Sequence, residues 1–150
     1  MQSPIQLFAL PLAPWERDGV KAALAKAGLP ADDVDAPEVL LWRFERNDVP
    51  IGFGGLEVHG DAALLRSLVT LPPVRNRGFG SAMVETIEVE AVARQVRAVY
   101  LLTTGDVGFF VRLGYAPCAR DDVPAEIRAT AQFAKLCPAS AVVMVKTLQN

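Results

Sequence analysis

The first half of the chain alternates short apolar runs with polar turns. Apolar runs at 39–45, 51–58 and 63–70 are separated by the turn sequences RNDVP and HGD. Apolar runs of this length, joined by tight turns, predict three strands of an antiparallel meander. An earlier run, IQLFAL at 5–10, predicts a first strand that precedes the meander.

A helical spacing separates the first predicted strand from the meander. Val20, Ala23, Leu24 and Ala27 follow the i, i+3, i+4, i+7 pattern of one helix face. The sequence GLP at 28–30 ends this predicted helix, because glycine readily adopts the left-handed stop conformation and proline cannot continue a helix.

The second half of the chain changes to longer elements. Residues 81–96 carry apolar side chains on one side and predict a helix, and AVYLLT at 98–103 predicts a buried strand after it. A strand, a helix and a strand in this order imply a right-handed parallel crossover. The remaining patterns predict helices over 106–115 and 123–136 and a final strand over 140–148. We therefore expect a mixed α/β fold.

The composition is that of an ordinary globular chain. Of the 150 residues, 51% are hydrophobic and 21% are charged, and the formal net charge is −2. A chain of this length can bury a substantial core, so we expect residues 1–150 to form a single domain. The negative net charge gives no basis for binding nucleic acid or an anionic membrane.

The N-terminus and the cysteines both favour a cytoplasmic location. The first fifteen residues are uncharged and contain three prolines, unlike a secretory signal peptide, and no apolar run is long enough to span a membrane. Cys118 and Cys137 are too few for a disulfide scaffold. Neither belongs to a CxxC pair, and His59 is the single histidine, so we expect no metal site.

The segment VRNRGFGSA at 74–82 combines glycine and arginine where a predicted strand passes into a predicted helix. The chain lacks the GxxxxGK[ST] pattern of a P-loop, and Met83 stands where a dinucleotide-binding turn has its third glycine. The spacing Arg75-x-x-Gly78-x-Gly80 suits an anion cradle instead. Glycines let the backbone N–H groups of a helix start approach a phosphate closely, and arginines beside them add charge.

These segments resemble a known family. LVTLPPVRNRGFGSA at 68–82 resembles the acetyl-CoA loop of the GNAT N-acetyltransferases, and GFFVRLGY at 108–115 resembles their fourth helix. The tail ATAQFAKLCPASAVVMVK at 129–146 is similar to the arsenic-resistance branch of these enzymes.

The resemblance implies a fold and a reaction. The implied GNAT fold has a central, mostly antiparallel sheet of about seven strands, with a parallel pair formed by the fourth and fifth strands and about four flanking helices. The implied reaction transfers acetyl from acetyl-CoA to a primary amine of a small molecule. Within the arsenic-resistance branch, the acceptor would be an amino-acid-like toxin.

The resemblance also implies cofactor-binding roles by position. The late part of the fourth predicted strand would pair with the pantetheine arm through Leu68, Val69 and Thr70. Thr103 stands where many relatives have an asparagine that faces the cofactor. Arg112 either reaches the nucleotide end or is a solvated surface residue. The pyrophosphate would lie on the loop made of Arg75, Asn76, Arg77, Gly78, Phe79, Gly80 and Ser81.

The catalytic residues are less clearly marked. Many relatives have a tyrosine general acid on the fourth helix, but the matching residue here is Phe110. Tyr115 is then either an alternative acid or a ring that packs against the sheet. Glu57 and His59 are candidate bases for the amine, and both also fit a surface position. Arg66 either faces the cleft and binds an acidic group of the substrate or points outward as a surface charge.

Two functions remain open on these assignments. One is an N-acetyltransferase that acts on a small amine. The other is a CoA-binding sensor or interaction module with weak catalysis or none, because the expected tyrosine is missing. Either function is compatible with a monomer or with a homodimer.

Overall fold

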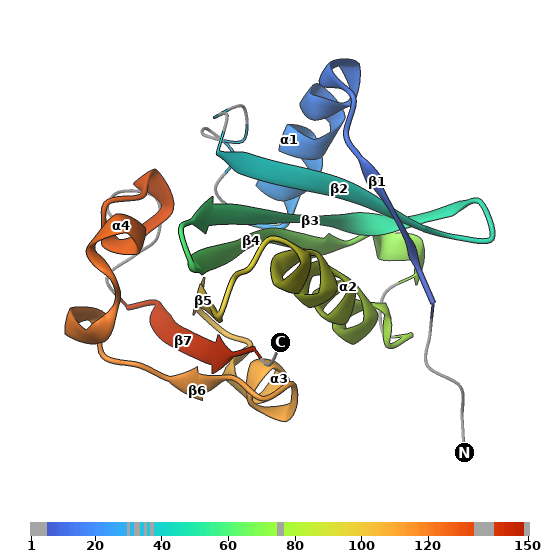
Figure 1. Ribbon diagram of the computed structural model, residues 1–150. Helices are drawn as coiled ribbons and strands as arrows, with labels where there is room; N and C mark the ends of the chain where they lie inside the picture. Colours follow the sequence, from blue (N-terminus) through green and yellow to red (C-terminus); the bar gives the residue numbers. More distant parts are fainter. Residues whose placement is uncertain are drawn as a thin grey trace.

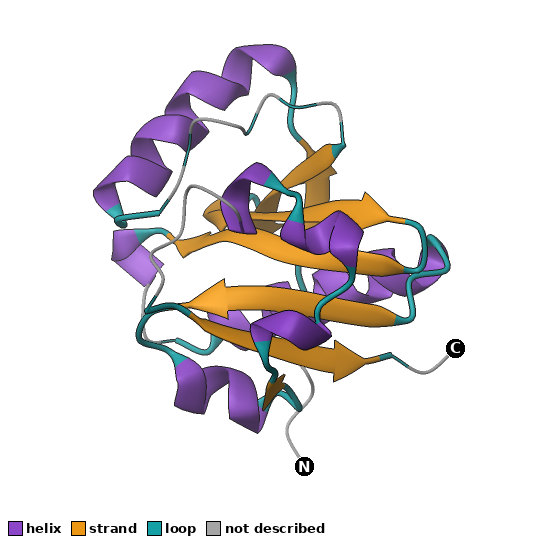
Figure 2. Cartoon of the chain, turned by 90° about the vertical axis from the view of Figure 1, so that its left-hand side faces the viewer, coloured by secondary structure: helices purple, strands orange, loops and turns teal. Residues whose placement is uncertain are grey.

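A seven-stranded sheet forms the centre of the molecule, with helices on both of its faces (Figures 1 and 2). The computed structural model describes residues 6–29, 31, 34, 36, 38–74, 77–133 and 140–148. The strand order in the sheet is β1-β2-β3-β4-β5-β7-β6. The strands are β1 Phe8–Pro11, β2 Val39–Arg46, β3 Val49–His59, β4 Ala62–Thr70, β5 Ala98–Thr103, β6 Ala116–Pro117 and β7 Val142–Thr147.

The two faces of the sheet bury alternate strand residues against different helices. Trp42 packs in the cluster of α2 (Phe79–Ala93) and α3 (Val107–Arg112), whereas its neighbour Leu41 packs in the cluster of α1 (Arg17–Lys26). In β4, Leu65 packs in the cluster of α2, whereas Leu64 packs in that of α4 (Ala125–Arg128). This alternation follows from the two-residue period of a strand. The helices are α1 Arg17–Lys26, α2 Phe79–Ala93, α3 Val107–Arg112 and α4 Ala125–Arg128.

The predicted meander and the predicted crossover are both confirmed. β2, β3 and β4 pair in antiparallel fashion. β4 and β5 are parallel, and they pair through Ala62–Ala98, Ala63–Val99 and Leu64–Tyr100. Over the described residues after Leu64, β4 pairs with β3 alone, so β4 and β5 separate towards their C-terminal ends.

β4 contains a bulge near the point where it separates from β5. Gly55 of β3 pairs with Arg66 and Phe53 pairs with Val69, so two residues of β4 lie opposite one residue of β3. Within the bulge, Ser67 has a φ of +60°, which is uncommon for a residue other than glycine. A bulge bends its strand and changes the direction of the groups that follow it.

The helix predicted over 123–136 is interrupted in the structure. α4 ends at Arg128, residues 129–130 form a turn, and residues 131–133 are helical again, while the last three residues of the predicted helix lie outside the described part of the chain. The Thr130 hydroxyl donates a hydrogen bond to the carbonyl of Ile127 (2.7 Å) and accepts one from the N–H of Phe133 (3.2 Å). A hydroxyl that binds nearby backbone groups competes with regular helical hydrogen bonding, so the chain turns here.

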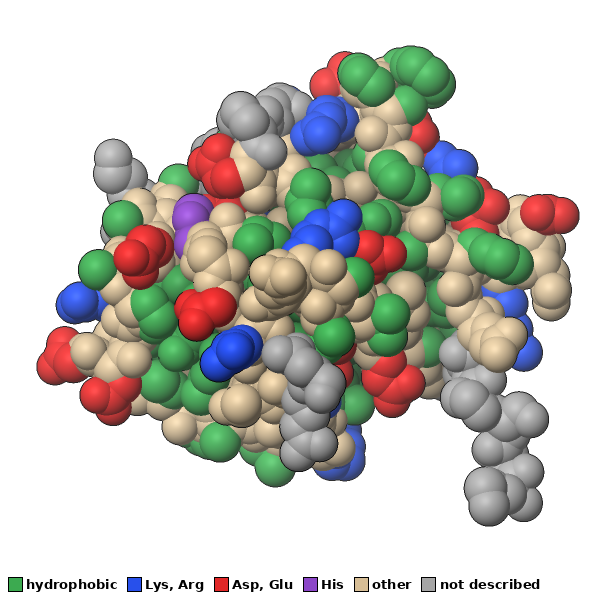
Figure 3. Space-filling model, in the orientation of Figure 1, with side chains coloured by type: hydrophobic (Ala, Val, Ile, Leu, Met, Phe, Trp, Pro, Cys, Tyr) green, Lys and Arg blue, Asp and Glu red, His purple; other side chains and the backbone are tan. Residues whose placement is uncertain are grey.

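The described surface carries charges of both signs. On the face that Figure 3 shows, Lys and Arg side chains are interspersed with Asp and Glu. None of the described helices combines the length and the apolar character needed to cross a lipid bilayer. Within the described ranges, no three His, Cys, Asp or Glu side chains are grouped so as to hold a metal ion. Cys118 is a free thiol, and Cys137 lies outside the described residues.

Candidate functional site

A cavity of about 1210 Å³ opens where β4 and β5 separate. Leu65–Thr70 form one wall and residues 101–106 form the other. The start of α2, the end of α1 with the chain that follows it, Phe109 and Phe110 of α3, Gln132 and Ala141 also line the cavity. Because β5 has left β4 over this stretch, the cavity-side edge of β4 lies open. An open strand edge offers backbone hydrogen bonds to an extended ligand.

The glycine loop forms part of the cavity at the start of α2. Residues 78–81 all line the cavity. Gly78 has a φ of +80°, a left-handed conformation that favours glycine. The Ser81 hydroxyl donates a hydrogen bond to the Gly78 carbonyl (3.1 Å). Since α2 starts in this loop and has fifteen residues, its first N–H groups and the positive end of its dipole lie beside the cavity.

The other loop residues differ in their surroundings. Arg77 is exposed, and Arg75 and Asn76 lie outside the described residues. A Cβ on Gly80 would lie 3.2 Å from Cζ of Phe109, so the absence of a side chain lets the Phe109 ring approach the loop closely. The loop and α3 therefore pack tightly together.

The remaining predicted cofactor residues are divided between the cavity and the surface. Residues 68–70 lie on the β4 wall and Thr103 lies on the β5 wall. The Thr103 hydroxyl accepts hydrogen bonds from the backbone N–H groups of Asp106 (3.1 Å) and Gly105 (3.5 Å), so it fixes the turn into α3. Arg112 is exposed on α3 and is not among the described residues that line the cavity.

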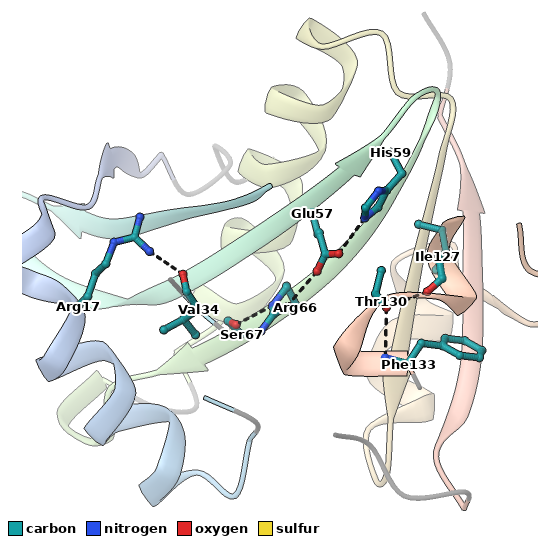
Figure 4. A network of polar contacts seen from close by, with 9 residues as sticks. All are labelled: Arg17, Val34, Glu57, His59, Arg66, Ser67, Ile127, Thr130 and Phe133. Carbon is teal, nitrogen blue, oxygen red and sulfur yellow. Dashed lines mark hydrogen bonds and ion pairs between the residues drawn. The ribbon is translucent and has the colours of Figure 1, made fainter. Parts of the chain in front are cut away.

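Arg66, Glu57 and His59 form a hydrogen-bonded chain across β3 and β4 (Figure 4). Arg66 Nη1 donates to Glu57 Oε1 (3.0 Å), and Glu57 Oε2 lies 2.8 Å from His59 Nε2. The side chain of Arg66 is completely buried, and that of Glu57 is 4% exposed, whereas that of His59 is 23% exposed. The positive charge of Arg66 is thus balanced by a carboxylate inside the protein.

A second cavity, of about 390 Å³, is lined by Glu57, His59, Glu38, Glu126 and the turn at 129–131. Arg66 lines the large cavity and Glu57 lines this second one, so the ion pair connects the two. Of the two positions left open for Arg66, the structure excludes the surface position, because the side chain is completely buried against Glu57.

Tyr115 lies in the core and not on the cavity wall. It is 2% exposed, and its hydroxyl donates a hydrogen bond to Glu88 Oε2 (2.8 Å). Burial, together with the nearby Glu88 carboxylate, raises the pKa of Tyr115 far above its ordinary value. Phe110 does line the cavity, and its ring packs edge-on against Tyr115 at 5.8 Å between ring centres. The geometry therefore favours the packing role of Tyr115.

Ser67 and Gln132 are among the polar residues of the cavity wall that were missed in the sequence. Ser67 stands in an apolar strand, and only the observed register with β3 reveals the bulge that contains it. Gln132 fell in the middle of a predicted helix, where a glutamine normally faces solvent. Neither residue type carries a motif that marks it.

Comparison with known proteins agrees with this geometry. Residues 5–115 match the model of the acetyltransferase (GNAT) family. An uncharacterized N-acetyltransferase from Chlorobaculum tepidum is 36% identical over 87 residues, which make up 57% of this chain and 56% of that protein. The alignment thus spans little more than half the length of that relative.

Solved structures with low sequence identity share the fold. N-acetylglutamate synthase from Neisseria gonorrhoeae, complexed with coenzyme A and N-acetyl-glutamate, has a TM-score of 0.80 at 14% identity, over 99% of this chain and 36% of that chain. Rv2747 from Mycobacterium tuberculosis, in complex with CoA and NLQ, has a TM-score of 0.76 at 20% identity, over 97% and 100% of the two chains. With the family model matched over residues 5–115, the chain belongs to the GNAT acetyltransferase family.

Proposed function

We propose that the protein is an acetyl-CoA-dependent N-acetyltransferase whose acceptor is a primary amine of a small molecule. The observation that carries the proposal is the cavity between β4 and β5, with the glycine loop and the start of α2 in its wall. The cavity volume of about 1210 Å³ and the open edge of β4 suit an elongated ligand with a phosphate group. Residues 1–150 would act as a single acetyltransferase domain.

The residues present fit acetyl-CoA. The N–H groups at residues 78–81 would hold the pyrophosphate, and the edge of β4 at 68–70 would pair with the pantetheine arm. When bound, acetyl-CoA supplies a thioester: a carbon–nitrogen bond forms to the amine, the carbon–sulfur bond breaks, and the sulfur leaves as a thiolate. Thiols have modest pKa values, so this departure does not require a strong acid.

The chain itself would hold the amine and remove its proton. An amine must lose a proton to attack, and Glu57 is the buried carboxylate of the ion pair that connects the two cavities. His59, hydrogen-bonded to Glu57 and partly exposed, would pass the proton to solvent. Arg66 would hold the Glu57 carboxylate in position through its own hydrogen bond.

The proposed acceptor is amino-acid-like. Two observations support this class: the tail resembles the arsenic-resistance branch, and the Neisseria enzyme of the same fold is complexed with N-acetyl-glutamate. The pairing of Arg66 with Glu57 weakens the argument for an acidic group on the acceptor, because the Arg66 charge is already balanced.

Release of CoA in the presence of an amine panel tests the proposal. The panel comprises amino acids, their arsenic- and phosphorus-bearing analogues, polyamines and lysine peptides. We expect turnover of amino-acid-like amines. Preferential turnover of polyamines would contradict the proposed acceptor class while leaving the acetyltransferase activity intact.

A CoA-binding module without catalysis is the second candidate. It is favoured by one observation: Phe110, which cannot donate a proton, lines the cavity at the position where many relatives have tyrosine. Tight CoA binding without turnover of any amine in the panel would support this candidate and contradict the enzyme.

A further inference from the structure

Ser67 stands in the bulge of β4, on the wall of the large cavity. Its φ of +60° is one that residues other than glycine rarely adopt. Glycine would take this conformation without strain, but it would bring no side chain. A strained residue persists where its surroundings hold it, and such residues gather at functional sites. We therefore expect the Ser67 side chain to perform a task that glycine could not.

The Ser67 hydroxyl contacts the buried guanidinium of Arg66 (Figure 4). Arg66 Nε donates a hydrogen bond to Ser67 Oγ (3.3 Å), and Arg66 Nη1 donates one to Glu57 Oε1 (3.0 Å). A guanidinium is planar and presents its N–H donors in a fixed fork. Partners on two of its nitrogens therefore restrict the orientation of the whole group. The hydroxyl in the bulge thus helps to set where the donor for Glu57 points.

This contact connects the two sides of the proposed reaction. Ser67 directly precedes residues 68–70, the edge of β4 that would pair with the pantetheine arm. Glu57 lies on β3, and its side chain, which would take the proton of the amine, is 4% exposed. A base works only within hydrogen-bond reach of its proton, and a displacement of about 1 Å can cost about a hundredfold in rate. The orientation of Arg66 therefore bears on the rate.

We propose that Ser67 is a positioning residue for Glu57 that acts through Arg66, an inference that rests on the proposed acetyltransferase function. The hydroxyl holds one nitrogen of the guanidinium, and the guanidinium holds the carboxylate. The base is thereby kept at a fixed place relative to the edge of β4 that would bind acetyl-CoA. Ser67 itself makes no contact with the reacting atoms in this role, so its removal should impair only what Glu57 does.

Steady-state kinetics on variants of the full chain tests the proposal, with the best amine of the CoA-release panel. Ser67→Gly removes the hydroxyl and takes the positive φ without strain. We expect kcat to fall by about tenfold, with the calorimetric CoA affinity within about threefold of the wild type. In a Glu57→Gln background the same substitution should cost less than about twofold, because the base that it positions is already gone. Ser140→Gly is the matched control, since Ser140 is exposed and lies outside the cavity lining.

A weakly basic amine, already neutral at the assay pH, gives a second measurement that does not require the double variant to fold. Such an amine depends less on Glu57, so the loss in Ser67→Gly should shrink to within about threefold. Ser67→Ala, which also lacks the hydroxyl, replaces Ser67→Gly if that variant does not fold.

Three results would overturn the proposal. One is a wild-type kcat in the variant without the hydroxyl. Another is an equal loss in both backgrounds, or with both amines. The third is a CoA affinity that falls as far as kcat, because Ser67 would then act on the cofactor. If the wild type turns over no amine at all, the proposed acetyltransferase function fails, and this inference fails with it.

Discussion

Gly78 holds a left-handed backbone conformation at the point where the chain enters α2. Valine would strain this conformation by about 1–2 kcal/mol and would place a branched side chain on the loop that lines the cavity. We predict that Gly78→Val lowers CoA affinity by at least about tenfold, because the N–H cradle is filled or displaced. Titration calorimetry on the folded variant measures this.

The control for this variant is Gly19→Val in α1, where no atom lies within 4 Å of the position of a Cβ. It should bind CoA as the wild type does. If Gly78→Val also keeps the wild-type affinity, the loop does not hold CoA.

Glu57 is the second residue for which we predict the effect of a substitution. Glutamine at this position keeps a hydrogen-bonding side chain but cannot take up a proton, so we predict that Glu57→Gln lowers kcat by about a hundredfold. The variant also removes the charge of a carboxylate that is buried in an ion pair with Arg66, which should lower the free energy of unfolding by about 3–5 kcal/mol. Initial rates and chemical denaturation measure the two effects separately.

An exposed glutamate on α2, Glu85, gives the matched control Glu85→Gln. His59→Gln provides a milder test of the same route, because His59 is partly exposed. A wild-type kcat in both Glu57→Gln and His59→Gln would exclude the proposed proton route.

At the residue scale, the sequence predicted the positions of the glycine-loop residues better than those of the residues proposed to act on the acceptor amine. Gly78 belongs to the spacing Arg75-x-x-Gly78-x-Gly80, which suits an anion-binding loop at a helix start, so its position could be predicted. The Arg66–Glu57 pair depends on the register between β3 and β4, including a bulge, and no local pattern encodes it. The break at Thr130, which precedes Gln132, was equally hidden.

At the scale of elements, a polar cluster joins α2, β7 and the chain after α3. Glu88 of α2 accepts hydrogen bonds from the Tyr115 hydroxyl (2.8 Å) and from Lys146 Nζ of β7 (2.9 Å). We predict that Tyr115→Phe keeps most of the activity, because Tyr115 lies in the core, and costs about 1 kcal/mol of stability for the lost hydrogen bond. Initial rates and denaturant unfolding check both values.

The raised pKa of Tyr115 also predicts a pH dependence. Below about pH 10 the phenol is protonated in the folded and unfolded states, so it contributes no slope. Above that pH only the unfolded chain loses the proton, so the free energy of unfolding falls by up to about 1.4 kcal/mol per pH unit. Tyr115→Phe should remove this contribution, as measured by unfolding between pH 9 and 11.

Tyr100→Phe is the comparison, because Tyr100 is only partly buried and its removal should change the alkaline slope of the free energy of unfolding less.

The reaction rate of Tyr115→Phe tests whether Tyr115 is a packing residue or a general acid. If Tyr115→Phe loses about a hundredfold in rate together with an alkaline limb of the pH–rate profile, Tyr115 is the general acid.

Elements with a strong local pattern were predicted well. The runs at 39–45, 51–58 and 63–70 became β2, β3 and β4, because alternation and tight turns fix a meander locally. The helix predicted over 123–136 is interrupted at 129–130, where the Thr130 hydroxyl binds the Ile127 carbonyl and no apolar spacing marks the break. The two-residue strand β6 has no pattern of its own and forms only because β7 lies beside it.

At the scale of the whole molecule, the ligand would bridge the separated ends of β4 and β5. A ligand that binds only the folded state at a hundred times its Kd stabilises that state by about 2.7 kcal/mol. For a chain of this size we predict a rise in Tm of about 5–10 °C with CoA. Thermal unfolding followed by circular dichroism, with and without CoA, measures it.

At the same CoA concentration the rise should be about half as large or smaller in Gly78→Val, because a tenfold weaker affinity leaves about 1.4 kcal/mol of stabilisation. A CoA-induced shift of equal size in both proteins would mean that CoA binds elsewhere on the molecule. No shift in the wild type would contradict CoA binding altogether.

The strand order has a consequence for biosynthesis. β7 comes last among the strands along the chain, yet in the sheet it lies between β5 and β6. While the chain emerges from the ribosome, β5 is therefore held through three residue pairs with β4, and β6 has no strand to join. An apolar edge of this kind attracts other extended segments. The nascent chain should accordingly need chaperone protection until residues 142–147 have left the exit tunnel. β7 can then form and pair with both β5 and β6.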